Sequence, residues 1–364
     1  MNKNKSVKIS DLSVSRRKWC LFFAVTISAF FVSLFLGRMT ISPDTVINIL
    51  GKNLLMLPIE VDWEKSTEIA VMRIRLPRAI IASFVGAGLS MSGAAFQGMF
   101  QNPLVSPFIL GVSAGASLGA ALGLVMGQPM VIVQVLSFIF GILAVSITYF
   151  TARIYKTTPI LMLVLAGTVV SAFFQAMLSL VKFLADTEDK LPTITFWLMG
   201  SMGSVSMEEL PFAILPMGIS MIVIFLVRWR LNVFSMGEKE AKSLGLNTEV
   251  LKFLIIVCTT LITATSVAFC GVIGWVGLVI PHLCRMLVGP DHKSLIPASI
   301  LIGATYLLII DNLCRIISAA EVPIGILTAV VGAPIFAYLL RKTKDTIGCI
   351  NSTPLLFCAG DMQK

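Results

Sequence analysis

The fold is decided by residues 79–127, AIIASFVGAGLSMSGAAFQGMFQNPLVSPFILGVSAGASLGAALGLVMG, a stretch without a single charged residue. It is longer than the roughly 20 apolar residues that cross a bilayer as one helix. Two prolines interrupt it, so we expect two spans with a break between them. Irregular backbone at membrane depth is tolerated only where protein buries it or where it lines a water-filled cavity. The residues of the break are therefore candidates for a pathway: Gln101, Asn102, Pro103 and Pro107.

Glycine recurs at every fourth position of the second of these spans. Lipid gives helices no hydrophobic reason to associate, so small residues that let backbones approach closely hold membrane helices together. A four-residue step advances about 40° beyond a full helical turn. We therefore expect the stripe to wind around its helix and to meet more than one neighbour. The predicted packing residues are Gly111, Gly115, Gly119, Gly123 and Gly127.

The composition of the whole chain agrees with a membrane protein. Of its 364 residues, 57% are hydrophobic and 13% are charged, and the mean hydropathy is +0.92. A soluble domain has about 25% charged residues, and so many apolar side chains cannot be hidden in one core. A soluble enzyme, a secreted disulfide scaffold and a disordered regulator are excluded. The seven cysteines have no CxxC spacing, and we expect no disulfide and no bound metal.

Ten apolar runs predict an all-α polytopic bundle. A basic segment precedes the first run, and cytoplasmic loops carry the excess of Lys and Arg. The N-terminus is therefore expected in the cytoplasm, and the net charge of +9 needs no nucleic acid to explain it. Whether the short run 275–288 crosses the membrane stays open. The runs are 19–37, 79–100, 107–126, 130–152, 159–182, 210–227, 253–273, 275–288, 294–315 and 323–340.

These runs divide the chain into three parts. We expect a basic cytoplasmic segment over 1–18, a transmembrane domain over 19–342 and a cytoplasmic tail over 343–364. The string Ser15-Arg16-Arg17-Lys18-Trp19 also resembles a twin-arginine export signal. No small-residue cleavage site follows it, so we expect a retained first helix.

A second interrupted segment lies late in the chain, at Gly274-Trp275-Val-Gly277-Leu-Val-Ile-Pro281-His282. Two Gly/Pro-interrupted segments in corresponding halves indicate an internal repeat around a translocation path. Gly277 and Pro281 are therefore added to the candidate pathway residues.

An arginine cluster contradicts the charge rule. Arg73, Arg75 and Arg78 lie in a loop that the predicted orientation places outside. Snorkelling explains a single such cation, but three within six residues indicate a site for an acidic partner, because a guanidinium binds a carboxylate through two hydrogen bonds. Asp311 lies four residues before Arg315, so these two side chains can pair on one helix face.

Motifs for chemistry are absent from the sequence. There is no G-x-x-x-x-G-K-[ST] loop for ATP and no H-E-x-x-H metalloprotease motif. The spans carry no Asp/Glu/His series for a proton relay. The chain is therefore typical of a transport subunit whose energy is supplied by a separate protein. The alternative is a secondary transporter or channel that works without ATP, since interrupted helices and repeats occur there too.

Several motifs in one order resemble the permeases for iron siderophores and cobalamin of the type II ABC importers. The resemblance covers about residues 65–342. The motifs are Arg75-Leu-Pro-Arg78, Gly86-Ala-Gly88-Leu-Ser-Met-Ser-Gly93, Gln101-Asn102-Pro103-Leu104, Leu110-Gly111-Val-Ser-Ala-Gly115, Phe196-Trp197-Leu-Met-Gly200, Gly274-Trp-Val-Gly277-Leu-Val-Ile-Pro281-His282-Leu-Cys-Arg285 and Glu321-Val-Pro323-Ile-Gly325.

The resemblance implies a subunit of ten helices in the inner membrane. Two such permease subunits, copies or paralogues, would surround one pathway. ATP and Mg would bind to partner ATPases, so this chain would be no enzyme and hold no cofactor, and an extracytoplasmic binding protein would deliver the cargo. Arg75, Arg78 and Arg315 match external arginines that receive glutamates of that protein; Arg73 has no such match. The implied cargo is a metal chelate, ferric siderophore first, with cobalamin or haem as alternatives.

The loop between the sixth and seventh runs resembles the permease loop that couples to the ATPase. A short helix ending at Gly245 is expected, because glycine tolerates a left-handed C-cap, and Asn247 is a suitable N-cap for a second short helix. Such a pair makes a compact knob for a groove on a soluble partner; a solvated loop is the alternative. The coupling residues are Gly237, Glu238, Glu240, Ala241, Leu244, Gly245, Leu246 and Asn247.

Overall fold

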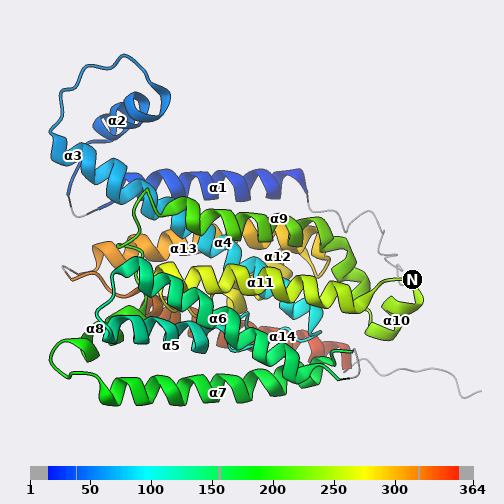
Figure 1. The fold of residues 1–364 in the computed structure, drawn as a ribbon. Helices are drawn as coiled ribbons and strands as arrows, with labels where there is room; N and C mark the ends of the chain where they lie inside the picture. The colour runs from blue at the N-terminus through cyan, green and yellow to red at the C-terminus, as the bar shows by residue number, and fades with distance from the viewer. Residues whose placement is uncertain (1–14, 38, 155–156, 319, 352–364) are drawn as a thin grey trace, which may run out of the picture.

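The computed structural model describes residues 15–37, 39–154, 157–318 and 320–351, and helices dominate this part of the chain (Figure 1). Predictions that fall on 1–14 and 352–364, in the basic segment and the tail, lie outside the described residues. The helices are α1 Arg16–Phe35, α2 Pro43–Leu55, α3 Lys65–Ile69, the π-helix Ala70–Arg75, α4 Leu76–Met99, α5 Val112–Val125, α6 Met130–Ala152, α7 Ile160–Leu184, α8 Lys190–Met199, α9 Leu210–Ser235, α10 Glu238–Ser243, α11 Thr248–Cys270, α12 Val276–Val288, α13 His292–Ile316 and α14 Ile324–Asn351.

The predicted polytopic all-α fold is confirmed. Seven helices are long and apolar enough to cross a membrane, and three shorter apolar helices accompany them at Val112–Val125, Val276–Val288 and Ile324–Leu339. Each of the ten predicted runs corresponds to one of these helices. The short run 275–288 forms α12, whose 13 residues measure about 20 Å along the axis, less than the roughly 30 Å of a bilayer core.

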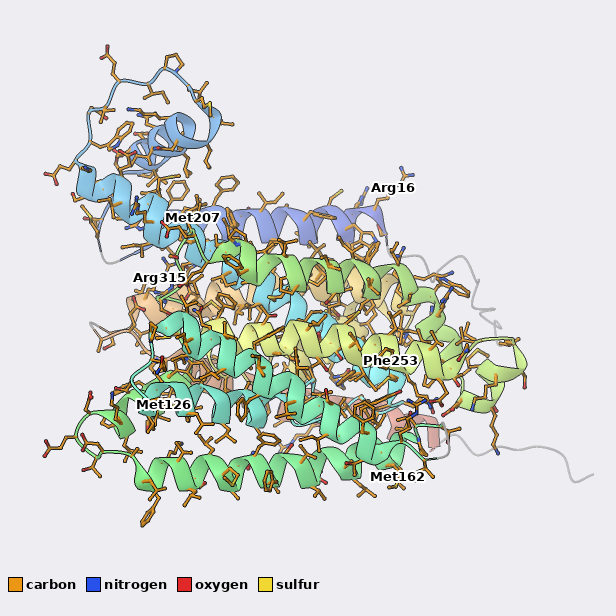
Figure 2. The ribbon with its side chains drawn as sticks, viewed as in Figure 1. Arg16, Met126, Met162, Met207, Phe253 and Arg315 are labelled. Carbon is orange, nitrogen blue, oxygen red and sulfur yellow. The ribbon has the colours of Figure 1, made fainter. Side chains whose placement is uncertain are left out.

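The bundle has two ends, which labelled residues identify. Arg16, Met162, Phe253 and the helix α10 lie at one end, which we call the α10 end (Figures 1 and 2). Met126, Met207 and Arg315 lie at the opposite end, which we call the Arg315 end (Figure 2).

Helix α4 forms the centre of the bundle, because its residues are small enough for neighbouring backbones to reach it. It contacts α9, α11, α12 and α13. A Cβ added at Gly86 would overlap the carbonyl of Gly303 on α13, and one added at Gly93 would overlap the carbonyl of Gly277 on α12. The helix is continuous over residues 65–99, and most of its most hydrophobic 18-residue segment is buried inside the protein. Close approach through small residues thus holds the core together.

The order of helices repeats along the chain, as the two interrupted segments predict. In the first half the buried helix α4 is followed by an irregular segment, the 14-residue α5 and the long α6 and α7. In the second half the buried α11 is followed by an irregular segment, the 13-residue α12 and the long α13 and α14. The matching lengths and burial support an internal repeat.

The glycine stripe packs against more than one neighbour, as predicted. Cβ atoms added at Gly115 and Gly119 would overlap carbonyls of α6, and Gly123 faces Val133 of the same helix. A Cβ added at Gly111 would instead contact Ser171 of α7. Gly111 and Gly127 lie outside α5 and have positive φ angles of 88° and 66°. The three glycines inside α5 therefore serve α6 alone, and the contact with α7 comes from the residue that precedes the helix.

Candidate functional site

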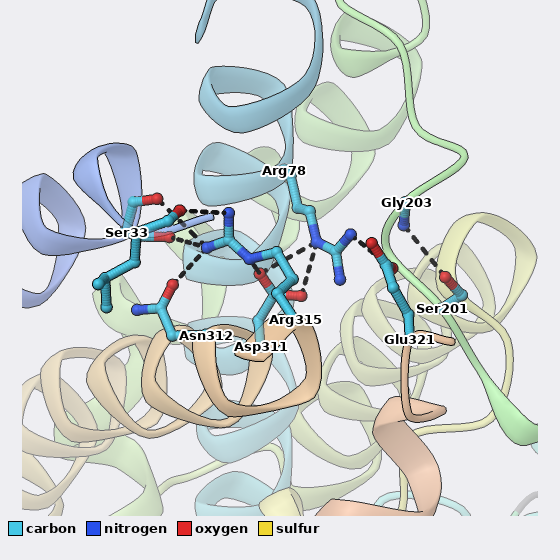
Figure 3. Close-up of polar contacts among 9 residues, drawn as sticks. Ser33, Arg78, Ser201, Gly203, Asp311, Asn312, Arg315 and Glu321 are labelled. Carbon is cyan, nitrogen blue, oxygen red and sulfur yellow. Dashed lines mark hydrogen bonds and ion pairs between the residues drawn. The ribbon is translucent and has the colours of Figure 1, made fainter. Parts of the chain in front are cut away.

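Three arginines from distant parts of the sequence, Arg75, Arg78 and Arg315, line one cavity at the Arg315 end. Figure 3 shows Arg78 and Arg315 with their partners. Arg75 ends the π-helix that precedes α4, Arg78 lies in the first turn of α4, and Arg315 lies in the last turn of α13. Single-turn π segments occur mostly at functional sites. All three side chains are buried, with 4 to 6% of each residue exposed.

Two carboxylates hold this cluster together. Arg78 donates from Nε to both oxygens of Asp311, at 2.8 and 3.1 Å, and from Nη1 to Glu321 at 2.8 Å. Asp311 also pairs with Arg315 at 3.3 Å, which confirms the predicted i,i+4 pair. Asp311 is fully buried, whereas the side chain of Glu321 is 36% exposed. With Arg75 included, three cations meet two carboxylates, so the cluster keeps one positive charge in excess.

The remaining donors of the cluster cap the C-terminus of α1. Arg75 donates from Nη1 to the carbonyls of Leu34 and Phe35, at 3.0 and 2.9 Å. Arg315 donates to the carbonyl of Leu36 and to the hydroxyl of Ser33, at 3.2 and 2.8 Å (Figure 3). The last carbonyls of a helix have no intrahelical partner and form the negative end of its dipole. Two buried guanidinium groups therefore fasten α1 to α4 and α13.

The sequence did not predict that these arginines are buried and paired within the chain. They lie at one end of the bundle, opposite α10, yet they are already paired within the chain. The exposed cation of the motif region is Arg73. A cavity of about 230 Å³ opens over the cluster and is lined by Gly37, Met39, Ala70, Ile74, Arg75, Arg78, Arg315 and Glu321.

At the α10 end, the predicted short helix is present and ends as expected. The N–H of Leu246 donates to the carbonyl of Ala241, and that of Gly245 donates to Lys242, both at 3.0 Å. This is a Schellman motif, with Gly245 at φ +80° in the position that needs a left-handed residue. Leu244 at the tip is 67% exposed, while Ala241 is buried against the bundle.

The second predicted short helix is not formed. Asn247 does cap a helix, accepting from the N–H of Val250 at 3.1 Å, but that helix is the 23-residue α11. The apolar run that follows Asn247 continues the helix into the bundle. The knob is therefore one short helix joined by a glycine turn to a long one.

A buried lysine connects this knob to the rest of the protein. Lys252 on α11 is 1% exposed and donates to the carbonyl of Thr158 at 2.8 Å. It also pairs with Glu238 of α10 at 3.2 Å and with Glu249 at 2.5 Å. Glu249 in turn accepts from the backbone N–H of Thr158 at 3.0 Å. Thr158 lies just before α7, so we call Thr158, Glu238, Glu249 and Lys252 the lysine clamp.

The electrostatics of α10 follow from the same contacts. Burial raises the pKa of Glu238, but the hydrogen bond from Lys242 and the charge of Lys252 outweigh it and leave this pKa below its ordinary value. The hydrogen bond to Glu238, at 2.8 Å, raises the pKa of Lys242. Both side chains are therefore charged at neutral pH.

The two interrupted segments meet in the centre of the bundle. The first break follows α4 as predicted, with Gln101 at φ +51° and its side chain donating to the carbonyl of Phe234 at 3.0 Å. A Cβ added at Gly277 would lie 2.6 Å from Pro107 Cδ and 2.8 Å from the Leu89 carbonyl oxygen. The second break lies earlier than predicted, between α11 and α12. Gly277 and Pro281 lie inside α12. The helix continues through Pro281 because the apolar side chains of α12 are buried against other helices.

Three contacts of these sites were not predicted. Glu321 lies in a quoted motif but was given no role, and Asp311 was expected to pair with Arg315 but not with Arg78. The buried position of Lys252 was not predicted either. The sequence did contain a signal for the pairing of Lys252. Glu249 and Lys252 have the i,i+3 spacing of an ion pair on one helix face, at the start of an apolar run.

Comparison with known proteins agrees with this architecture. The FecCD transport family matches residues 25–342. The chain is 41% identical over 313 residues to the molybdate import system permease protein MolB of Haemophilus influenzae, covering 86% of this chain and 92% of that protein. It is 35% identical over 296 residues to the hemin transport system permease protein HmuU of Yersinia pestis, covering 78% and 87%.

A further relative and a solved structure extend the comparison. The cobalamin import system permease protein BtuC of Halobacterium salinarum is 35% identical over 285 residues, covering 78% of this chain and 76% of that protein. A metal-chelate type ABC transporter solved in an inward-facing conformation superposes with a TM-score of 0.79 at 37% identity, covering 90% of this chain and all of that one. The chain thus belongs to the FecCD transport family and is a permease of the ABC importer class for metal chelates.

Proposed function

We propose that this chain is the membrane permease of a binding-protein-dependent importer of a ferric chelate, energised by a separate ATPase. The carrying observation is that two sites suited to different partners lie at opposite ends of one helical bundle (Figure 2). The Arg315 end presents buried arginines under a cavity, and the α10 end presents a rigid knob. In this proposal the α10 end and the N-terminus face the cytoplasm, and ATP and Mg bind only to the partner ATPase.

The Arg315 end is proposed to receive carboxylates of an extracytoplasmic binding protein. The cluster carries one positive charge in excess and lies beneath a cavity of about 230 Å³. Glu321 is the partly exposed member and already holds Arg78. It therefore occupies the place that a partner's carboxylate would take. Docking would exchange one carboxylate for another at Arg78, which keeps the buried guanidinium paired throughout.

The α10 end is proposed to insert its knob into a groove of the ATPase. Leu244 and Met236 are 67% and 69% exposed there. The Schellman turn fixes the direction of α10 relative to α11. A rigid, partly apolar projection is suited to carry force between two chains.

The lysine clamp is proposed to transmit the movement of α10 into the bundle. Lys252 binds the knob through Glu238 and binds the start of α7 through the Thr158 carbonyl. Helix α7 is among the least buried spans. A displacement of α10 would therefore move the end of α7 rather than break the clamp, because a buried cation without its partners is costly. ATP binding to the partner would thus bias two states of the permease.

The cargo has a second candidate. Relatives of this chain have names that refer to iron chelatin, hemin, cobalamin and molybdate. Molybdate is favoured by the 41% identity to MolB over 92% of that protein. Both candidates are metal-containing species, and the binding protein that delivers the cargo makes much of the choice.

The test is uptake by cells that lack this gene, using radiolabelled iron on a panel of siderophores, haem, cobalamin and molybdate. Selective loss of one iron chelate supports the proposed cargo. Selective loss of molybdate, haem or cobalamin replaces the cargo but keeps the importer. Uptake by vesicles holding this chain alone, driven by an ion gradient, contradicts the ATP-dependent proposal.

A further inference from the structure

A cavity at the Arg315 end faces away from the arginine cluster. It holds about 400 Å³ and is lined by Val131, Gln134, Val135, Phe138, Glu209, Phe212, Pro216, Thr265 and Phe269. Helix α11 contacts both α9 and α6, and in Figure 1 it runs between them. The cavity therefore has α11 as its floor and α6 and α9 as its walls.

The mouth of this cavity is formed by exposed apolar side chains. Val131, Val135 and Phe212 are 58%, 49% and 74% exposed. They lie on α6 and α9, which are apolar enough to span a membrane. Both residue 131 and residue 209 are close to the ends of their helices at the Arg315 end, where Met126 and Met207 lie (Figure 2). The mouth is thus at the depth of one leaflet's glycerol and headgroup region.

Polar groups without partners lie inside this otherwise apolar cavity. The hydroxyl of Thr265 is buried, at 1% exposure of the residue, and has no hydrogen-bond partner among the described residues. Gln134 is 6% exposed. Pro216 has no N–H to donate to the Phe212 carbonyl four residues earlier. Buried polar groups are normally satisfied, so these groups point to a ligand that carries hydrogen-bonding atoms.

A carboxylate stands at the rim. Glu209 is the residue before α9, and its Oε2 accepts from the backbone N–H of Ser206 at 3.5 Å. Glu209 forms no ion pair among the described residues. An unpaired carboxylate at this position favours a cationic donor and disfavours an anion.

We propose that this cavity binds one phospholipid with a primary-amine headgroup, of the phosphatidylethanolamine type, from the leaflet at the Arg315 end. The acyl chain would lie along Val135, Phe138 and Phe269. The ester carbonyls would accept from Thr265 and Gln134, and the ammonium would donate to Glu209. Phosphatidylcholine has the same charge but no N–H donor, and an anionic lipid would face the carboxylate. The inference depends on the membrane-spanning fold and not on the cargo.

A second groove offers an internal comparison. It is lined by Phe84, Ile214, Leu215, Gly218, Ile219, Met221, Ile222, Phe225 and Ile300, and it holds about 520 Å³. All of its lining residues are apolar, so it gives no reason to select a headgroup. Lipid at that groove should exchange without preference.

The experiment measures lipid retention by the permease assembled with its ATPase. The complex is reconstituted in nanodiscs with equal parts of phosphatidylethanolamine, phosphatidylcholine and phosphatidylglycerol of identical acyl chains, then released and analysed by native mass spectrometry. We expect one retained phosphatidylethanolamine, favoured about tenfold over phosphatidylcholine. The reason is that the primary ammonium donates a charged hydrogen bond to Glu209, which the choline group cannot do. Equal retention of the two lipids overturns the proposal.

Matched variants locate the site. Glu209→Gln should remove the headgroup preference, and Thr265→Val, which keeps the shape of the side chain, should reduce retention. Glu208→Gln is the control, because its exposed carboxylate is adjacent but does not line the cavity. An equal loss in Glu208→Gln contradicts the assignment. A photo-crosslinker at Val131 should yield lipid adducts; adducts between two permease chains would show that a second subunit covers the cavity, and would overturn the proposal.

Discussion

Arg78 and Asp311 face each other across the interface of α4 and α13, with the guanidinium Nε at 2.8 and 3.1 Å from the two carboxylate oxygens. They are separated by 233 residues of chain. Asp311 at the same time neutralises Arg315. One fully buried carboxylate therefore holds two buried cations, and the arrangement fastens three helices at one end of the bundle.

Asp311→Asn should strongly destabilise the permease. The substitution keeps the volume but leaves Arg78 and Arg315 with too little negative charge in a buried place. Breaking a buried pair in this way costs about 3–5 kcal/mol. The thermal midpoint of the detergent-purified protein should fall, and a fluorescence melt measures it. Asp44→Asn is the control, because Asp44 lies exposed in the first turn of α2 at the same end. Equal midpoints for both variants would contradict the structural role of Asp311.

Glu321→Gln should strengthen docking of the proposed acidic binding protein. The amide no longer competes with an incoming carboxylate for Arg78, while Asp311 still keeps that arginine paired. We expect a decrease in Kd of about tenfold, of the size of one charged hydrogen bond. Surface plasmon resonance on nanodiscs measures it. Glu60→Gln is the control, since Glu60 is exposed and outside the cluster. Weaker docking by Glu321→Gln would show that Glu321 assists the partner instead of competing with it.

The burial of the arginines also changes how docking is tested. Arg75→Glu with Arg78→Glu is the direct charge reversal, but it would leave unpaired carboxylates against the carbonyls of α1 and would unfold that end. Arg73→Glu is the informative variant, because Arg73 is exposed beside the cluster. We expect it to slow association with the binding protein more at low salt than at high salt. A rate that does not depend on salt would exclude electrostatic docking at this face.

Gly245→Val should weaken ATPase binding with little effect on the membrane domain. The position has a φ of +80°, which costs a β-branched residue about 1–2 kcal/mol, so the Schellman turn should open. Gly245→Asn is the matched rescue, because asparagine tolerates this conformation. Co-purification with the ATPase should fall for valine and return for asparagine. Equal co-purification by both variants would remove the turn from the coupling site.

Lys252→Met should separate ATP hydrolysis from transport. The methionine side chain fills a similar volume but carries no charge. Glu238 and Glu249 lose their shared cation, and Glu238 loses its connection to Thr158, while Glu249 still accepts from the Thr158 N–H. Cargo transported per ATP should fall severalfold while the complex still assembles, and Lys252→Arg should restore part of it. Lys239→Met is the control, since Lys239 is exposed on α10 outside the clamp. An unchanged transport-to-hydrolysis ratio in Lys252→Met would contradict transmission through the clamp.

The contribution of Glu238 should depend on pH in a defined direction. Its pKa is lowered from 4.5 in the folded protein, because the contacts with Lys242 and Lys252 outweigh burial. Its ion pairs therefore stabilise the fold fully above about pH 4.5, and this stabilisation is lost as the pH falls through the lowered pKa. The difference in thermal midpoint between wild type and Glu238→Gln should be constant near neutrality and vanish in acid. A difference that grows in acid would contradict the assigned direction.

Much of the fold could be predicted because a bilayer imposes simple rules on a sequence. The ten apolar runs, the break after α4 and the turn at Gly245 each depend on local properties: length, proline and glycine. The second break was placed too late because Pro281 lies inside α12, where contacts with other helices stabilise a helix that proline alone would interrupt.

The sequence by itself determined that this chain crosses a membrane many times, that its longest apolar stretch breaks after α4, and which motifs place it among the metal-chelate permeases. Only the tertiary structure decided that Arg78 is held by Asp311 and Glu321, and that Lys252 joins α10 to the start of α7. The physical reason is separation along the chain. Hydropathy and capping act within a few residues, whereas buried charges are paired by helices whose order in space no local pattern contains.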